Sequence, residues 1–415
     1  MKIFIVNLIL TAAVIISNAY GFGSPADFGE VEVPVGKTFS GPIATANLNS
    51  NNNSSIYIPD QRLEHLLRVA LGKEEGDFIT YSDMQQLTEL DLSSSGINDI
   101  TGLEYAANLT KLNLTNNKIT NITPLANLIN LNELNLSYNR IKDIRAVVNL
   151  SNLTVLRASY NLIEDINVFS NPNLGNLTEL HLNGNMITDI TPLGAVDNSS
   201  KPIFINLVKL DISDNKFPRS PKVPSDHRDY CGHKEDVERI KSLYPLQKLS
   251  NLTYLRASSN QISDIAPLAN LTNLVKLDLS NNMISDINPL ENLSDLVDLN
   301  LCHNRIKDIS PLAHPNLIGL TNLNLNVNLI NNITPLKGLT NLTWLLINYN
   351  YITNIQPLID NPGLYTEHPD SGTRNDLVDL RWNKLDLRTD SEDMLNIRAL
   401  INRCVDVYYK PQDEK

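Results

Sequence analysis

Residues 274–295 read LVKLDLSNNMISDINPLENLSD, and most of the chain repeats this pattern. When Leu274 is position 1, Leu277 and Leu279 fall at positions 4 and 6, and Asn282 falls at position 9. Six of the eleven spacings between unit starts are 22 residues, a period that is typical of leucine-rich repeats. The twelve units start at Leu87, Leu109, Leu131, Leu153, Leu177, Leu207, Leu252, Leu274, Leu296, Leu320, Leu342 and Asn375.

The spacing within one unit predicts a strand, a turn and a short helical segment. Apolar residues at positions 4 and 6 alternate with mostly polar residues at positions 3, 5 and 7, which indicates a strand with one buried face. Ile284, Ile287 and Leu290 would fill the core behind that strand. We therefore expect an α/β repeat solenoid, a leucine-rich-repeat horseshoe with a parallel concave sheet, short 3₁₀ or helical convex segments, a helical N-terminal cap and an α/β C-terminal cap.

An asparagine at position 9 recurs in every unit except the first, which has Ser95. At this position the chain leaves the sheet, and its backbone groups lose their partners. A column of side-chain amides could satisfy those groups from unit to unit, since buried polar groups need partners. The predicted ladder consists of Asn117, Asn139, Asn161, Asn185, Asn215, Asn260, Asn282, Asn304, Asn328, Asn350 and Asn383. Aspartates at position 13 recur with the repeat too, so we expect a structural role for Asp143, Asp165, Asp264, Asp286 and Asp308.

Composition excludes several classes of protein. A formal charge of -12 argues against a nucleic-acid partner, which needs a basic surface. Three cysteines, Cys231, Cys302 and Cys404, are too few for a disulfide framework. Beyond the N-terminus no apolar run reaches the length of a membrane span. We expect a monomer without a cofactor or a bound metal.

The order of segments predicts an exported protein. Residues 1–21 combine Lys2, a short apolar run and small residues, the composition of a secretory signal peptide; an uncleaved anchor is the alternative. Residues 22–55 form a flexible leader, 56–86 a helical N-terminal cap, 87–388 the repeats, and 389–415 the C-terminal cap and tail. In the N-terminal cap we expect one helix from Asp60 to Gly72 and a capping box formed by Thr80 and Asp83.

Residues 58–105, IPDQRLEHLLRVALGKEEGDFITYSDMQQLTELDLSSSGINDITGLEY, resemble the N-terminal cap and first repeat of the internalin family. The DIxPLxxLxNL units are similar to that family throughout residues 56–361. The resemblance implies an exported bacterial scaffold that binds proteins, in some members host cell-surface proteins. The sequence has no LPxTG motif, no downstream repeat modules and no room for an immunoglobulin-like domain, which puts wall anchoring in doubt.

The longest insertion, at 218–244, contains His227, Asp229, Cys231 and His233. These residues could ligate a metal, but no tight zinc spacing such as CxxC accompanies them. The apolar residues Val237, Ile240 and Leu243 predict instead that the insertion ends in a helix. Because no catalytic motif occurs in the chain, we expect no enzymatic activity.

Positions 3, 5, 7 and 8 are predicted to point outward from the concave sheet. Six of these 48 positions are aromatic, about twice the 6% aromatic content of the chain. Tyr and Trp are common hot-spot residues of protein interfaces, and arginines there can pair with ligand carboxylates. The candidate ligand-binding residues are Tyr138, Arg157, Tyr160, Tyr254, Arg256, Trp344, Leu346, Tyr349, Arg381 and Trp382. Tyr138 and Tyr160, at position 8 of adjacent units, should lie side by side. Aromatic residues on a sheet can also serve packing alone.

Three functions are compatible with these patterns. The first is a secreted internalin-like protein that binds a protein ligand through its concave face. The second is a secreted solenoid that uses the same face to bind a glycan or inhibit an enzyme. The third, an enzyme, would require a metal in the insertion at 218–244.

Overall fold

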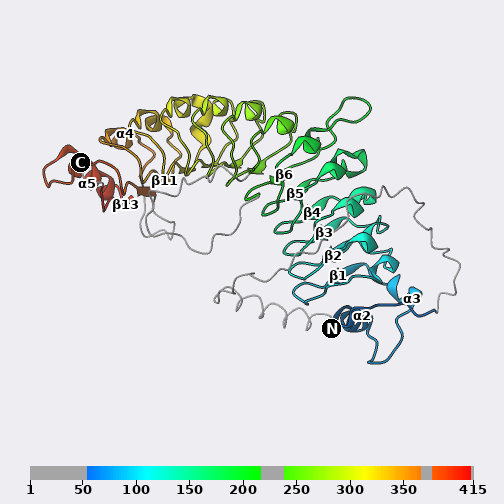
Figure 1. The fold of residues 1–415 in the computed structure, drawn as a ribbon. Helices are drawn as coiled ribbons and strands as arrows, with labels where there is room; N and C mark the ends of the chain where they lie inside the picture. Colours follow the sequence, from blue (N-terminus) through cyan, green and yellow to red (C-terminus); the bar gives the residue numbers. More distant parts are fainter. Residues whose placement is uncertain (1–53, 216–237, 366–375, 413–415) are drawn as a thin grey trace. The chain divides into compact units, whose positions relative to one another are not determined.

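A computed structural model of the protein describes residues 54–215, 238–365 and 376–412. Its main feature is a parallel sheet in which each strand pairs with the next strand along the chain (Figure 1). The strands are β1 Glu89–Asp91, β2 Lys111–Asn113, β3 Glu133–Asn135, β4 Val155–Arg157, β5 Glu179–His181, β6 Lys209–Asp211, β7 Tyr254–Arg256, β8 Lys276–Asp278, β9 Asp298–Asn300, β10 Asn322–Asn324, β11 Trp344–Leu346, β12 Leu377–Asp379 and β13 Asp406–Tyr408.

Equivalent repeat positions pair across neighbouring strands. Lys276 lies opposite Asp298, and Leu277 lies opposite Leu299. This register places every position-4 residue in one buried row, and the position-6 residues form a second buried row. The predicted leucine-rich-repeat solenoid is therefore confirmed, including the last strand, β13, which follows the twelve repeats.

Short 3₁₀ segments lie on the opposite side of each coil from the strands. Most have proline in the first turn, where its missing N–H needs no partner. Position 13 fixes their start: Asp286 accepts the N–H of Asn288 at 2.9 Å, and Asp308 accepts that of Ser310 at 2.8 Å. The segments are η1 Leu103–Tyr105, η2 Thr123–Leu125, η3 Arg145–Asn149, η4 Asn167–Ser170, η5 Pro172–Leu174, η6 Thr191–Gly194, η8 Tyr244–Leu246, η9 Ala266–Leu268, η10 Asn288–Leu290, η11 Ser310–Ala313, η12 Pro315–Gly319 and η13 Thr334–Gly338.

Helices lie at both ends of the repeats. α2 (Gln61–Leu71) begins after the cap Asp60 and ends at Gly72, whose φ of 67° permits the left-handed turn. α3 (Tyr81–Met84) has the predicted capping box of Thr80 and Asp83. Short α4 (Gln356–Ile359) takes the place of a 3₁₀ segment, and α5 (Glu392–Asn402) precedes β13. None of these helices has the length and apolar character needed to cross a membrane.

The long insertion ends earlier than the sequence predicts. Residues 216–237, which include His227, Asp229, Cys231 and His233, lie outside the described residues. From residue 238 onward no helix precedes η8, so the predicted helix is wrong for this part. Ile240 and Leu243 are instead fully buried, and Ile240 accepts the N–H of Gln261 at 3.0 Å. The repeat thus resumes at position 10 with Arg239, because these residues fill the ordinary core positions.

The position-9 asparagines connect consecutive coils. Asn304 is buried, and its Nδ2 donates to the carbonyls of Leu279 (3.0 Å) and Leu301 (3.1 Å). Its Oδ1 accepts the N–H of Ile284 at 3.0 Å. Leu279 and Ile284 belong to the preceding unit, so one amide satisfies backbone groups of two coils.

We predict that Asn304→Ala destabilises the protein by about 3 kcal/mol, because buried donors and acceptors would lose their partners. Urea denaturation measures this change. The exposed Asn292 makes no side-chain hydrogen bond with any described residue, so Asn292→Ala should change stability by less than about 0.5 kcal/mol. Equal stability of the two variants would contradict the role of Asn304.

Candidate functional site

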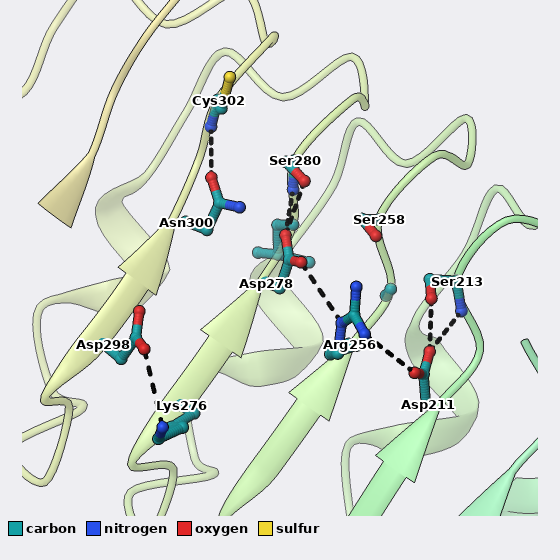
Figure 2. Close-up of polar contacts among 12 residues, drawn as sticks. Asp211, Ser213, Arg256, Ser258, Lys276, Asp278, Ser280, Asp298, Asn300 and Cys302 are labelled. Atoms are coloured by element: carbon teal, nitrogen blue, oxygen red, sulfur yellow. Dashed lines mark hydrogen bonds and ion pairs between the residues drawn. The ribbon is translucent and has the colours of Figure 1, made fainter. Parts of the chain in front are cut away.

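The outward face of the sheet is narrower than the sequence predicts. Position 3 and position 8 reach the surface, but six of the twelve position-7 residues are buried. These side chains are short, and Ser213 Oγ, for example, donates to Asp211 in the same coil (Figure 2). Buried position-7 residues are Ser137, Ser159, Asn183, Ser213, Ser258 and Ser280.

Position 8 has a left-handed backbone in every unit, a feature that the sequence analysis missed. Its φ is 54° at Asn281, 69° at Gly184 and 51° at Tyr349. Gly, Asn and Asp tolerate this conformation best, and they occupy four of the twelve position-8 sites. Their recurrence at this position was the signal in the sequence that could have predicted a left-handed backbone. Tyr138, Tyr160, Tyr349 and Trp382 adopt it at a cost of about 1–2 kcal/mol each. Local backbone preference therefore does not explain the aromatic residues here.

The position-8 rings form two stacked pairs. Tyr138 and Tyr160 stack with centroids 4.5 Å apart and an interplanar angle of 16°. Tyr349 and Trp382 stack with centroids 5.3 Å apart and an angle of 14°. A Cβ at Gly184 would lie 2.5 Å from the Tyr160 ring, so glycine leaves the space that this ring occupies. The predicted adjacency of Tyr138 and Tyr160 is confirmed.

The structure brings together the candidate residues near the C-terminal end. Trp344 on β11 is 42% exposed, and Leu346 on the same strand is half-buried. Tyr349 follows that strand and stacks on Trp382, the next position-8 residue. We call Trp344, Leu346, Tyr349 and Trp382 the C-terminal cluster. Strands β5 to β10 separate it from the Tyr138–Tyr160 pair.

Arg381 lies beside the C-terminal cluster but has partners of its own. Its guanidinium donates to Asp379 at 2.7 and 2.9 Å and lies 5.6 Å from the ring centroid of Tyr408. Burial alone would raise the pKa of Asp379, but hydrogen bonds from Arg381 and Asn348 lower it below its ordinary value. Asp379 is therefore ionised at neutral pH, and Arg381 is held by it.

Charged residues in the middle of the face pair with one another. Arg256 lies 3.5 Å from both Asp211 and Asp278 (Figure 2). Arg157 lies 3.1 Å from Glu179, which also contacts Lys209 at 2.6 Å. Arg157 and Arg256, predicted to meet ligand carboxylates, already have carboxylate partners within the sheet. A ligand would have to compete with those ion pairs.

Three other titratable groups on the face have pKa values shifted by burial. Burial raises the pKa of Cys302 to about 12, so its thiol is protonated at neutral pH. Burial likewise lowers the pKa of His181 and raises that of Tyr254. Within the described ranges no group of three His, Cys, Asp or Glu residues is arranged to hold a metal.

Comparisons with known proteins agree with this geometry. A family model described as "Leucine Rich repeats (2 copies)" matches residues 85–127, 151–195 and 250–292, and one described as "Leucine rich repeat" matches 107–163. The crystal structure of an internalin (inlF) from Listeria monocytogenes is 30% identical, with a TM-score of 0.70, over 85% of this chain and 91% of that one. The chain belongs to the internalin family. A comparison with curated sequences gave no match.

Two receptors share the fold of this internalin-family chain. A TDR receptor is 20% identical with a TM-score of 0.56, over 80% of this chain and 57% of that one. The plant peptide hormone receptor RGFR1, solved in complex with RGF2, is 20% identical with a TM-score of 0.53, over 81% and 54%. Identity this low shows the fold alone. Membership in the internalin family supports a leucine-rich-repeat scaffold for protein interaction.

We predict that Glu179→Gln lowers the free energy of unfolding by about 1 kcal/mol at pH 7. Lys209, its hydrogen-bond partner, lowers the pKa of Glu179 below the ordinary 4.5, against the effect of burial. A lowered folded-state pKa stabilises the protein above the unfolded pKa, and this stabilisation disappears as pH falls through the folded value. Urea denaturation should therefore show the difference at pH 7 and little difference below pH ~3.

Glu133→Gln is the matched control for this change. Glu133 also occupies position 3, but it lies 3.7 Å from Lys111 and its side chain is 45% exposed. Glu133→Gln should lower the free energy of unfolding by less than about 0.5 kcal/mol at pH 7. If the loss of stability caused by Glu179→Gln does not vary with pH, the ion pairs of Glu179 contribute nothing to that loss.

Proposed function

We propose that this protein is an exported scaffold that binds a protein ligand through the outward face of its sheet, with the C-terminal cluster at the centre of the contact. The observation that carries the proposal is the Tyr349–Trp382 stack. Both residues have left-handed backbones, with φ of 51° and 55°, where an aromatic residue is unfavourable. The conformational cost of these two residues is offset if their rings contribute to binding of a ligand.

The chemistry of the C-terminal cluster supports a protein ligand. Trp and Tyr supply large contact areas with little loss of side-chain freedom, and they are enriched at interface hot spots. The cluster contains no charged side chain, and nearby Arg381 is held by Asp379. Docking there would not desolvate an unpaired charge, which is a large penalty in interfaces. The paired charges on β6 to β9 would then flank the contact and contribute mainly to orientation.

The Tyr138–Tyr160 pair is a second contact in this proposal. Tyr138 is 47% exposed, and the pair has the same stacked geometry at the same repeat position. Tyr254 and Arg256 lie on β7, between the two aromatic pairs, and Arg157 lies on β4, the strand that precedes Tyr160. A ligand that spans these strands would contact both pairs.

Packing is the competing explanation for Tyr349 and Trp382. The N–H of Trp382 donates to the carbonyl of Pro411 at 2.7 Å, so its backbone takes part in the C-terminal end of the fold. That bond does not depend on the side chain. Substitution of both residues by asparagine therefore separates packing from ligand binding. Asparagine tolerates the left-handed backbone and already occupies position 8 at Asn116 and Asn281.

We predict that Tyr349→Asn/Trp382→Asn lowers the affinity for the protein ligand at least tenfold with little change in melting temperature. Loss of stacking costs about 1 kcal/mol, and relief of the left-handed strain offsets it. Surface proteins of host cells and of the producing cell would be captured with residues 56–415, and the affinity measured by surface plasmon resonance. Ser259→Asn, at position 8 without a ring, should bind like wild type. Unchanged binding by the double variant would refute the site, and a large drop in melting temperature would favour packing.

Export is the second part of the proposal, and residues 1–21 support it. We predict that the full chain expressed in a Gram-positive host appears in the medium with its first residue at Tyr20 or Phe22, because cleavage after Ala19 or Gly21 follows small residues. Intact-mass measurement checks the start site. A chain that lacks residues 1–21 should stay inside the cell. Retention of the full chain in the membrane fraction would indicate an uncleaved anchor.

A further inference from the structure

A hollow of about 230 Å³ lies on the sheet face beside Trp344. Three neighbouring strands, β9, β10 and β11, each contribute the residues at positions 3 and 5. One wall is apolar, and the rest of the hollow is lined by amides and one carboxylate. The side chains that line it are Asp298, Asn300, Asn322, Asn324, Trp344 and Leu346.

The amides in this hollow are held with their donors unused. Asn300 Oδ1 accepts the N–H of Cys302 at 3.1 Å (Figure 2), and Asn324 Oδ1 accepts that of Asn326 at 3.1 Å. These bonds fix the orientation of both amides. Neither Nδ2 donates to any residue within the described ranges, although each carries two N–H groups. The two strands are adjacent, about 4.8 Å apart, and Asn300 lies opposite Asn324, so the two amides occupy neighbouring places in the hollow.

The charge of the hollow is balanced by a neighbouring residue. Its single carboxylate, Asp298, lies 3.8 Å from the ammonium of Lys276 (Figure 2). The next carboxylate along the sheet, Asp278, is paired with Arg256. Lys276 would repel a cation that approached this carboxylate, and Asp298 would repel an anion. The hollow therefore favours an uncharged ligand.

We infer that this hollow binds one ring of a neutral saccharide. A sugar ring has an apolar C–H face that matches Trp344 and Leu346, and hydroxyl oxygens that can accept from Asn300 and Asn324. A purely apolar side chain of a protein would bury those amide donors without partners, which is unfavourable. A hollow of this volume holds a single ring, so an oligosaccharide would extend from it across the sheet.

The inference goes beyond the proposed function and does not depend on it. Trp344 and Leu346 belong to both sites, whereas Asn300 and Asn324 line the hollow alone and Tyr349 and Trp382 belong to the protein contact alone. Substitutions can therefore remove either activity separately. Tyr349→Asn/Trp382→Asn should leave saccharide binding within a factor of two of wild type.

The test uses residues 56–415 and a panel of neutral oligosaccharides built from glucose, galactose, mannose or N-acetylglucosamine, with sialylated and sulfated oligosaccharides alongside. Ligand-observed NMR at millimolar concentration detects binding, and titration gives the Kd. We expect at least one neutral saccharide to bind, and Trp344→Ala to weaken it at least tenfold. Circular dichroism checks that this variant remains folded.

Asn324→Asp provides a second variant with a matched control. Aspartate keeps the acceptor for the N–H of Asn326 and removes both Nδ2 donors, so saccharide affinity should fall at least fivefold. Asn135 occupies position 5 on β3 and accepts the N–H of Ser137 at the same 3.1 Å, far along the sheet from Trp344. Asn135→Asp should bind like wild type. No binding of any neutral saccharide, preference for charged ones, or full binding by Trp344→Ala would each overturn the inference.

Discussion

The need to satisfy backbone groups where each coil leaves the sheet governs this structure. Strands of three residues supply few ladder bonds, and the chain must then turn away from the sheet. The amide of Asn282 satisfies the turn: its Nδ2 donates to Ala257 and Leu279 at 3.0 Å, and its Oδ1 accepts from Ile262 at 3.0 Å. Because each amide contacts the preceding coil, the coils must stack in one register.

The same turn explains where function can be placed. The residue before each ladder asparagine adopts a left-handed backbone in every coil. Rings at that position reach their equivalents in the next coil, as Tyr138 does with Tyr160. Side chains at one repeat position therefore form a row along the sheet. The chemical type of the side chains in a row changes only where the sequence of several consecutive units changes.

Charges on the sheet follow the same rule. At position 5 of β6, β7 and β8 acidic and basic residues alternate, so that Arg256 lies between Asp211 and Asp278. These pairs leave the middle of the face polar but nearly neutral. On β10 and β11, amides and apolar side chains replace the charges, and the C-terminal cluster and the hollow both include this part of the sheet. The side chains in each part of the face, and not the net charge of -12, therefore determine which ligands that part can bind.

The amino-acid sequence alone determined the repeat, the buried rows and both helix caps, because periodic apolar residues and capping side chains act over short distances. It also predicted which aromatic residues share the outward face. Only the tertiary structure decided that Arg157 and Arg256 already have partners, that position 8 is left-handed, and that Ile240 rejoins the core after the insertion. The donors of Asn300 and Asn324 became recognisable as unused in the same way. Each of these properties depends on which residues lie side by side in neighbouring coils or on a backbone angle, and neither can be read from the residue pattern within one unit.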